Sequence, residues 1–335
     1  MKNNNLISVI IPTYKGEKSI KLLCDEIVKK FNFINLEIII IDDNSPDNTK
    51  QICLDMIDRS HDNILYIKLT KNFGEHNAVF AGLKYCKGDW AIIIDDDFQN
   101  PISEAVKLTD YALKNSYDVI YSNYKKKKHN IFRNLGSKLN DISASIFLKK
   151  PKNLYLSSFK IVKKNVIEKI LHYNGPSPYI DGLILSITSN ISCIEVEHHE
   201  RDIRFGKSNY NIAKLLKLYI DVISSFSTRP LRICSIFGLI ITIFSIIFGI
   251  IIIFEKIFYP NLTSGYPSVM IAIIFFSGIQ LIFLGLIGEY IGKILKNVNN
   301  NKPYYIELIK KRNEKNLNLN NKLLSILHKS KIIAK

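Results

Sequence analysis

The stretch AIIIDDDFQNP, Ala91–Pro101, decides the fold. Its first four residues are apolar and three of them are β-branched, which predicts a strand buried on both faces of a sheet. Pro101 cannot donate to a sheet ladder, so the strand must end before it. In an α/β sheet, ligands bind just beyond the carboxyl ends of the strands. The three acids that follow this strand are therefore expected at a ligand site.

These acids also predict a metal site. Asp95, Asp97 and Gln99 are spaced two apart, so in an extended chain their side chains would point to the same side. Three oxygen ligands that converge on one point suit a hard cation such as Mg²⁺ or Mn²⁺. The alternative is an acidic turn with solvated carboxylates, and this stretch alone does not separate the two interpretations.

The sequence before this strand repeats the same pattern of an apolar run followed by a helical segment. The expected strands are Leu6–Ile11, Leu36–Ile41 and Ile64–Leu69, and the expected helices are Glu17–Phe31, one that reaches Asp58, and Glu75–Cys86. This order predicts a doubly wound, mostly parallel sheet, which Ile102–Tyr121 extends by a helix and a strand. Asp42-Asp43 and Asp95–Asp97 then share one rim. No G-x-G-x-x-G follows the first strand, which disfavours a dinucleotide-binding Rossmann domain.

Composition limits the partners. The chain has 335 residues, 47% of them hydrophobic, and a formal net charge of +16, which favours an anionic partner such as nucleic acid, anionic lipid or a phosphorylated substrate. Its five cysteines are scattered, which argues against a disulfide framework or a zinc site and fits a reducing compartment. The polar Met1–Asn5 leads directly into a strand, so we expect no cleavable signal peptide.

Four sequence blocks in order carry a family resemblance. They are SVIIPTY (Ser8–Tyr14), IDDNSPDNT (Ile41–Thr49), NFG with AGL (Asn72–Gly74 and Ala81–Leu83) and DDDFQ (Asp95–Gln99). The chain resembles the inverting family 2 glycosyltransferases of GT-A fold. It is more closely similar to the polyprenyl-phosphate glycosyltransferases, the group that includes dolichol-phosphate mannose synthase and undecaprenyl-phosphate glucosyl- and aminoarabinose transferases.

The resemblance implies a nucleotide-sugar site and a metal site. Pro12, Tyr14 and Asp43 match positions that hold the base and ribose, and Asp95 and Asp96 match the acids near the diphosphate. Asp95, Asp97 and Gln99 match the metal ligands, and Asp95 and Asp97 are also expected to be catalytic. The family usually has Asn-Glu after Pro-x-Tyr, whereas this chain has Lys15-Gly16-Glu17. Glu17 is the candidate replacement for the displaced acid.

The resemblance also implies an acceptor site and a closing loop. Arg133, Ser137 and Lys160 match positions that bind the acceptor phosphate, for which a guanidinium offers bidentate hydrogen bonds. The adjacent Lys125–Lys128 run is either part of this site or a solvated loop. Arg204 and Lys207 lie in RDIRFGKSNY and match catalytic cations that close over the donor diphosphate.

The sequence after Tyr210 is typical of a membrane protein. Ile233–Phe254 and Ser268–Gly288 are uncharged runs of about 22 and about 21 residues, long enough to span a bilayer. Apolar and lysine residues between 210 and 230 predict a helix lying on the membrane surface. Positive charges flank the outer ends of this hairpin, which places the catalytic domain and both termini in the cytoplasm. The flanking residues are Arg229, Arg232, Lys293 and Lys296, against Lys256 in the connecting loop.

Together these features predict an α/β GT-A domain (1–209), an amphipathic juxtamembrane helix (210–230), transmembrane helices (231–255 and 267–289) and a cytoplasmic Lys/Asn-rich tail (290–335). The expected function is inverting transfer of a sugar, from a UDP-sugar rather than a GDP-sugar, to undecaprenyl phosphate in the cytoplasmic membrane, with Mg²⁺ or Mn²⁺. A homo-oligomer, for which the resemblance favours a tetramer, is expected, and nucleic acid is not a partner. The alternatives are a polysaccharide or glycolipid acceptor, or an inactive membrane scaffold.

Overall fold

The computed structural model describes residues 5–31, 34–59, 63–124, 151, 154–199, 231, 236–241, 243–244, 247, 250, 257–258, 265–298 and 302–312. These residues fall into two compact units. One holds the described residues up to 199 together with residues 302–312, and the other holds residues 231–298. Each unit is described by itself.

The first unit is built on one eight-stranded sheet with the order β7-β5-β6-β4-β1-β2-β3-β8. Its strands are β1 (Leu6–Thr13), β2 (Asn35–Asp42), β3 (Ile64–Leu69), β4 (Trp90–Ile93), β5 (Val119–Tyr124), β6 (Lys160–Lys163), β7 (Ile191–Val196) and β8 (Ile306–Lys311). The four predicted N-terminal strands pair in parallel in the order β4-β1-β2-β3. The predicted doubly wound core of the sheet is confirmed.

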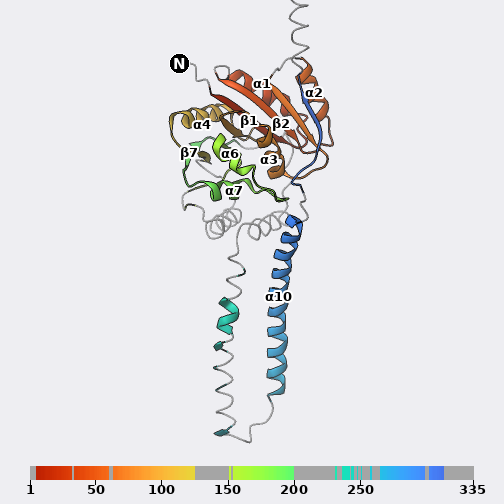
Figure 1. Ribbon diagram of the computed structural model, residues 1–335, viewed down its shortest axis with the longest axis vertical. Coiled ribbons are helices and arrows are strands. Elements are labelled where there is room, and N and C mark those ends of the chain that lie inside the picture. The colour runs from red at the N-terminus through yellow and green to blue at the C-terminus, as the bar shows by residue number, and fades with distance from the viewer. Residues whose placement is uncertain are drawn as a thin grey trace, which may run out of the picture. The chain divides into compact units, whose positions relative to one another are not determined.

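Helices cover both faces of this sheet (Figure 1). The helices are α1 (Ile20–Lys30), α2 (Thr49–Arg59), α3 (Glu75–Tyr85), α4 (Ile102–Lys114), α6 (Lys164–Ile170) and α7 (Ile180–Ile187). α1, α2 and α4 pack on one face in a single apolar core with alternate residues of the central strands. α3 packs against β1 and β2 on the other face, next to α7. Alternate strand residues therefore face two helical layers, which explains why these strands are apolar throughout.

The spacing of buried residues explains why the helices dock where they do. In α1 the buried residues Ile20, Leu23, Cys24 and Ile27 recur at the spacing of one helix face. α3 approaches β1 and β2 closely because Gly82 has no side chain. A Cβ at this position would lie 2.6 Å from the Ile41 side chain and 2.7 Å from that of Ile10.

The antiparallel strands complete the sheet. β6 pairs antiparallel with both β4 and β5, and β5 pairs parallel with β7. β8 comes from the C-terminal segment and pairs antiparallel with β3, with a register shift between Lys68 and Leu69. This strand lies inside residues 290–335, which we expected to be a Lys/Asn-rich tail. Part of that tail therefore belongs to the eight-stranded sheet.

In the second unit, α10 (Tyr266–Val298) is a single helix of 33 residues. Its window Phe275–Gly292 is long and apolar enough to cross a membrane, none of that window is buried, and it is the one such helix among the described residues. α10 contains the predicted span 267–289 and continues beyond it. Two transmembrane helices were predicted. The residues described between 236 and 250 are helical, and most of the span 231–255 lies outside the described residues.

Candidate functional site

Three strand ends and their acids meet at one rim of the sheet, as the sequence predicts. β1 and β2 are paired to their last residues, with Thr13 opposite Asp42. The Asp43 amide donates to the Thr13 carbonyl at 2.9 Å, and the Thr13 hydroxyl donates to the Asp96 carboxylate. Thr13 therefore joins the acids that follow β2 and β4. Pro12, just before it, is buried, and Tyr14, just after it, is 40% exposed.

Asp43 is held in place by backbone amides. One carboxylate oxygen accepts the Phe73 amide at 2.7 Å and the other accepts the Gly74 amide at 2.8 Å. Burial raises the pKa of Asp43, the two amide bonds oppose this, and the neighbouring Asp42 raises it further. Gly74 has φ of +92°, a backbone conformation that favours glycine. The NFG block therefore supplies the amides that orient Asp43.

Asp42 is occupied within the fold. Its side chain is fully buried, one oxygen accepts the Tyr66 hydroxyl at 2.7 Å and the other accepts the Ser45 amide at 2.7 Å. Burial and the bond to Asp42 raise the pKa of Tyr66. The two adjacent acids after β2 therefore differ. Asp42 fixes the turn into α2, and Asp43 lies at the rim.

Unusual backbone conformations gather at the same rim. Lys15, Asn44 and Phe98 have φ of 64°, 58° and 58°, and each follows one of the strands β1, β2 and β4. They are the only described residues other than glycine with positive φ. Such conformations are uncommon outside glycine and cluster at ligand sites, where the surrounding structure holds them.

The Lys15-Gly16-Glu17 departure has a structural basis. A Cβ at Gly16 would lie 2.2 Å from the Thr13 hydroxyl oxygen and 2.6 Å from the Asp96 carboxylate, so a larger residue would displace both. The Glu17 carboxylate accepts the Asn48 amide at 3.2 Å, and the Glu17 amide donates to Asp47 at 3.3 Å. Glu17 is therefore tied to the start of α2, and its expected role as a donor-binding acid stays a prediction.

The acidic loop after β4 is turned, whereas we had assumed an extended chain. β4 ends at Ile93, Phe98 is left-handed, and the Gln99 amide donates to Asp97 at 3.2 Å. Strand alternation therefore does not align the side chains of Asp95, Asp97 and Gln99. These three side chains are partly exposed at the rim, and their oxygens are of the type that Mg²⁺ and Mn²⁺ prefer. Among the residues that the structure describes, no three His, Cys, Asp or Glu side chains form a ready metal cluster.

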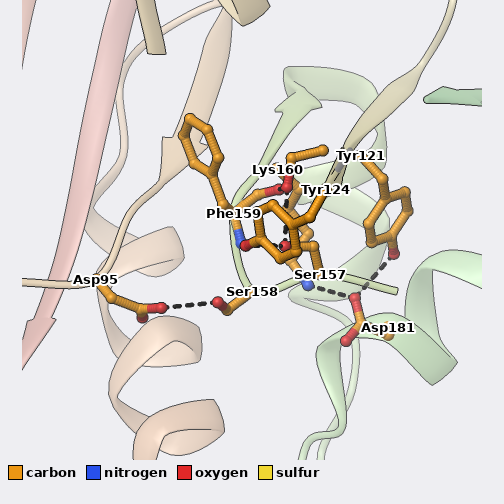
Figure 2. Close-up of polar contacts among 9 residues, drawn as sticks. Asp95, Tyr121, Tyr124, Ser157, Ser158, Phe159, Lys160 and Asp181 are labelled. Atoms are coloured by element: carbon orange, nitrogen blue, oxygen red, sulfur yellow. Dashed lines mark hydrogen bonds and ion pairs between the residues drawn. The ribbon is translucent and has the colours of Figure 1, made fainter. Parts of the chain in front are cut away.

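Ser158 adds a partner to this loop that the sequence did not reveal. Its hydroxyl donates to the Asp95 carboxylate at 2.7 Å, as Figure 2 shows. The adjacent Ser157 points into a separate network, in which its hydroxyl oxygen lies 2.8 Å from that of Ser122 and 2.8 Å from that of Tyr124. The segment before β6 thus fixes the first acid of the loop. The two residues are 63 positions apart in the sequence, so no local sequence pattern predicts this bond.

The segment after β7 also reaches the acidic loop. The His199 amide donates to the Gln99 carbonyl at 2.9 Å, and the His198 ring packs on Tyr124 with centroids 4.2 Å apart. Neighbouring residues of a strand point to opposite faces, so the sequence does not predict that these adjacent histidines both chelate a metal. In the structure this segment contacts the acidic loop at Gln99.

Lys160, expected to bind the acceptor phosphate, is buried and paired within the fold. It is 3% exposed, and its ammonium donates to Asp181 on α7 (Figure 2). The Tyr121 hydroxyl donates to the same Asp181 oxygen at 2.8 Å, and the Lys160 ammonium lies 5.1 Å from the centroid of the Tyr121 ring. We call Lys160, Asp181 and Tyr121 the buried triad. The role of Lys160 in acceptor binding stays a prediction.

His76, at the start of α3, lies beside the triad. Its ring meets that of Tyr179 edge-on, with centroids 4.9 Å apart. Burial lowers the pKa of His76 to about 4, with Asp181 opposing the shift and Lys160 adding to it. His76 is therefore neutral at pH 7.

Four expected site residues lie outside the described residues. They are Arg133 and Ser137 of the acceptor site, and Arg204 and Lys207 of the loop expected to close over the diphosphate. The juxtamembrane helix 210–230 lies outside them as well. The described rim thus brings together Pro12, Tyr14, Asp43 and Asp95–Gln99, and it places Lys160 in the buried triad.

Comparison with known proteins agrees with this geometry. The family model described as glycosyl transferase family 2 matches residues 8–171, which contain β1 to α6 and the acidic rim. A second model, described as the GtrB C-terminal hairpin, matches residues 229–294, which include most of α10. One match lies in each unit of the chain.

The chain is similar to curated proteins over nearly its whole length. It is 29% identical over 307 residues to the undecaprenyl-phosphate 4-deoxy-4-formamido-L-arabinose transferase of Yersinia pestis, a match that covers 90% of this chain and 93% of that one. The protein of the same name from Yersinia pseudotuberculosis matches with the same identity and coverage.

Solved structures share the fold. Glucosyl-3-phosphoglycerate synthase from Mycobacterium tuberculosis, crystallised with Mn²⁺, UDP and phosphoglyceric acid, matches with a TM-score of 0.51 at 16% identity and covers 67% of this chain and 78% of that one. The same enzyme with Mg²⁺ and UDP matches with a TM-score of 0.50 at 15% identity and the same coverage. The α/β unit therefore has the GT-A fold. With the fold, the acidic rim and the two matched family models in agreement, the chain contains a family 2 glycosyltransferase domain.

Proposed function

We propose that this chain transfers a sugar from a nucleotide sugar, a UDP-sugar rather than a GDP-sugar, to undecaprenyl phosphate. The observation that carries the proposal is the rim at which Asp43, Asp95 and Asp96 meet, in a chain similar over 90% of its length to transferases named for undecaprenyl phosphate. UDP is favoured as the donor nucleotide because the solved enzyme of the same fold was crystallised with it.

We assign different residues of the rim to different parts of the donor. We assign Pro12, Tyr14 and Asp43 to the base and ribose, because a buried carboxylate held by two amides is a fixed acceptor for hydroxyl groups. Asp95, Asp97 and Gln99 would hold a divalent metal, with the diphosphate completing its ligands, as is usual for Mg²⁺. Bound there, the metal would stabilise charge on the departing nucleoside diphosphate.

The acceptor needs little activation. A lipid phosphate is already an anion at pH 7, so its oxygen can attack the anomeric carbon without a strong general base. The C–O bond to the diphosphate breaks as the new C–O bond forms, and this single displacement inverts the anomeric configuration. We assign Arg204 and Lys207 to the departing charge, and Arg133 and Ser137 to the lipid phosphate.

Chain topology supports a membrane hairpin with the catalytic unit and the C-terminal strand on the same side. β7 and β8 belong to one sheet, and α10 lies between them in the sequence. If α10 crosses a membrane, the chain between β7 and β8 must cross an even number of times. A second crossing would lie before α10, in the part matched by the hairpin model. The basic residues that flank the hairpin favour the cytoplasmic side.

A transfer assay tests the proposal. Purified full-length protein is incubated with undecaprenyl phosphate, Mg²⁺ or Mn²⁺ and a panel of labelled UDP- and GDP-sugars, and label is counted in the organic phase. One donor should give label that EDTA abolishes. Asp97→Ala should reduce it about 10³-fold, the scale of losing charge stabilisation in a transition state. Asp25→Ala, an exposed acid on α1, is the matched control and should leave it unchanged.

Two outcomes would contradict the proposal. Metal-dependent release of nucleotide from one donor, with no label in the organic phase, would point to a polysaccharide or glycolipid acceptor. No turnover of any donor by folded protein would favour the inactive scaffold.

A further inference from the structure

The loop that orients Asp43 is short and is held from two sides. Residues 70–74 connect β3 to α3. On one side, the Phe73 and Gly74 amides donate to the two Asp43 oxygens. The position of this carboxylate therefore depends on the path that the loop takes.

The other side of the loop is held by the segment that enters β8. The Thr70 amide donates to the Tyr305 carbonyl at 3.0 Å, and the rings of Phe73 and Tyr305 pack with centroids 6.3 Å apart. Tyr304, one residue earlier, meets Phe80 of α3 edge-on at 6.4 Å. Residues 304–305 thus contact both the loop and the helix that follows it.

β8 is anchored to β3 independently of these rings. Glu307 forms ion pairs with Lys68 at 2.5 Å and with Lys50 at 3.3 Å, and these lysines lower the pKa of Glu307. The strand pairs with β3 from Leu69 to Leu65. β3 has β2 on its other side. Without β8, β3 would therefore be the edge strand of the sheet next to the 70–74 loop.

We propose that Tyr305 and β8 position Asp43 for the donor nucleotide, with Tyr305 a positioning residue that acts through the 70–74 loop. The inference rests on the proposed function, because it takes Asp43 to hold the donor. It adds a role for a part of the chain that lies outside the matched residues 8–171 and 229–294. That part follows α10 by only a few residues in the sequence.

Tyr305→Ala tests the positioning in the full-length protein. The backbone bond from Thr70 can persist, but the ring on Phe73 is lost and the loop should loosen. We expect the KM for the donor to rise about fivefold with kcat changed less than about twofold, which is the pattern of weakened donor binding. Tyr305→Phe keeps the ring and should restore the wild-type KM. Lys310→Ala, which removes a 3.8 Å ion pair to Asp58 farther along β8, is the control and should behave as wild type.

Amide hydrogen exchange provides a readout that does not need turnover. In Tyr305→Ala, peptides covering residues 70–74 should exchange about fivefold faster or more, because the Phe73 and Gly74 amides lose their fixed bonds to Asp43. In Tyr305→Phe and Lys310→Ala these peptides should exchange as in the wild type.

The two readouts separate the inference from the proposed function. Unchanged exchange and unchanged KM in Tyr305→Ala would overturn the inference while transfer by the wild type still stands. If the wild type turns over no donor, the proposed function fails. In that case, faster exchange in Tyr305→Ala would still support the contact between Tyr305 and the 70–74 loop. Unchanged exchange would overturn that contact.

Discussion

The acidic rim and the buried triad use the same kinds of residue for opposite purposes. At the rim, Asp43 and Asp95 are held by backbone amides and a serine hydroxyl. In the triad, Lys160 and Asp181 are each less than a tenth exposed and satisfy one another. The Asp43 carboxylate is held by two neutral amides, whereas the buried ion pair has its charges balanced within the fold. Residue type alone therefore does not identify a ligand-binding charge.

The largest expected effect comes from breaking the triad. Lys160→Met should destabilise the protein by about 3 kcal/mol, because it leaves Asp181 buried without its counter-charge. Chemical denaturation of the full-length protein in detergent measures this. Lys163→Met on the same strand, whose ammonium lies 5.8 Å from the centroid of the Trp90 ring, is the control and should cost less than about 1 kcal/mol.

One result from these variants would remove the distinction between the acidic rim and the buried triad. If Lys160→Met were as stable as Lys163→Met and lost transfer activity, Lys160 would serve the acceptor phosphate, and the triad would belong to the site.

His76 makes the triad region sensitive to acid. Its folded pKa of about 4 lies below the usual 6.5, so the unfolded chain binds the proton more tightly. This contribution to stability is present above pH 6.5 and is lost as pH falls toward 4, by up to about 3 kcal/mol for a shift of this size. Denaturation midpoints at several pH values measure the loss.

The matched variant for this prediction is His76→Gln, which removes the titrating group. Its stability should depend less on pH between 6.5 and 4 than that of the wild type. An equally steep decline in both proteins would assign the acid sensitivity to other groups.

The smallest expected effect tests how Asp95 is positioned at the rim. Ser158→Ala removes the hydroxyl that holds Asp95, so half-maximal activity should need several times more Mn²⁺. This corresponds to about 1 kcal/mol, the typical net contribution of one hydrogen bond. Ser157→Ala is the paired control, because its hydroxyl contacts Ser122 and Tyr124. Equal metal dependence in the two variants would show that Ser158 does not position Asp95.

Local sequence predicts the first four strands because burial on both faces of the sheet requires continuous apolar runs. Each of the three predicted runs between Leu6 and Leu69, and the run Ala91–Ile94, overlaps a strand of the sheet. The resemblance to the polyprenyl-phosphate glycosyltransferases, drawn from four short blocks, is confirmed by the comparisons. These features could be predicted because each is written within a few consecutive residues.

The remaining features depend on partners far apart in the sequence. Lys68 pairs with Glu307 across 239 residues, so nothing near Ile306–Lys311 announces a strand of the catalytic sheet. Thr13 and Asp96 meet across 83 residues. The burial of Lys160 follows from the position of α7, which Lys160 itself does not encode. The turn at Phe98 overrode the strand alternation that we expected at Asp95–Gln99.

The central claim is that the acidic rim, and not the buried triad, binds the nucleotide with a divalent metal. Isothermal titration of UDP, and in parallel GDP, into the full-length protein with and without Mn²⁺ tests it most directly. We predict metal-dependent binding of UDP that Asp97→Ala abolishes and that folded Lys160→Met retains. Binding that survives Asp97→Ala, or that disappears in folded Lys160→Met, would contradict the account.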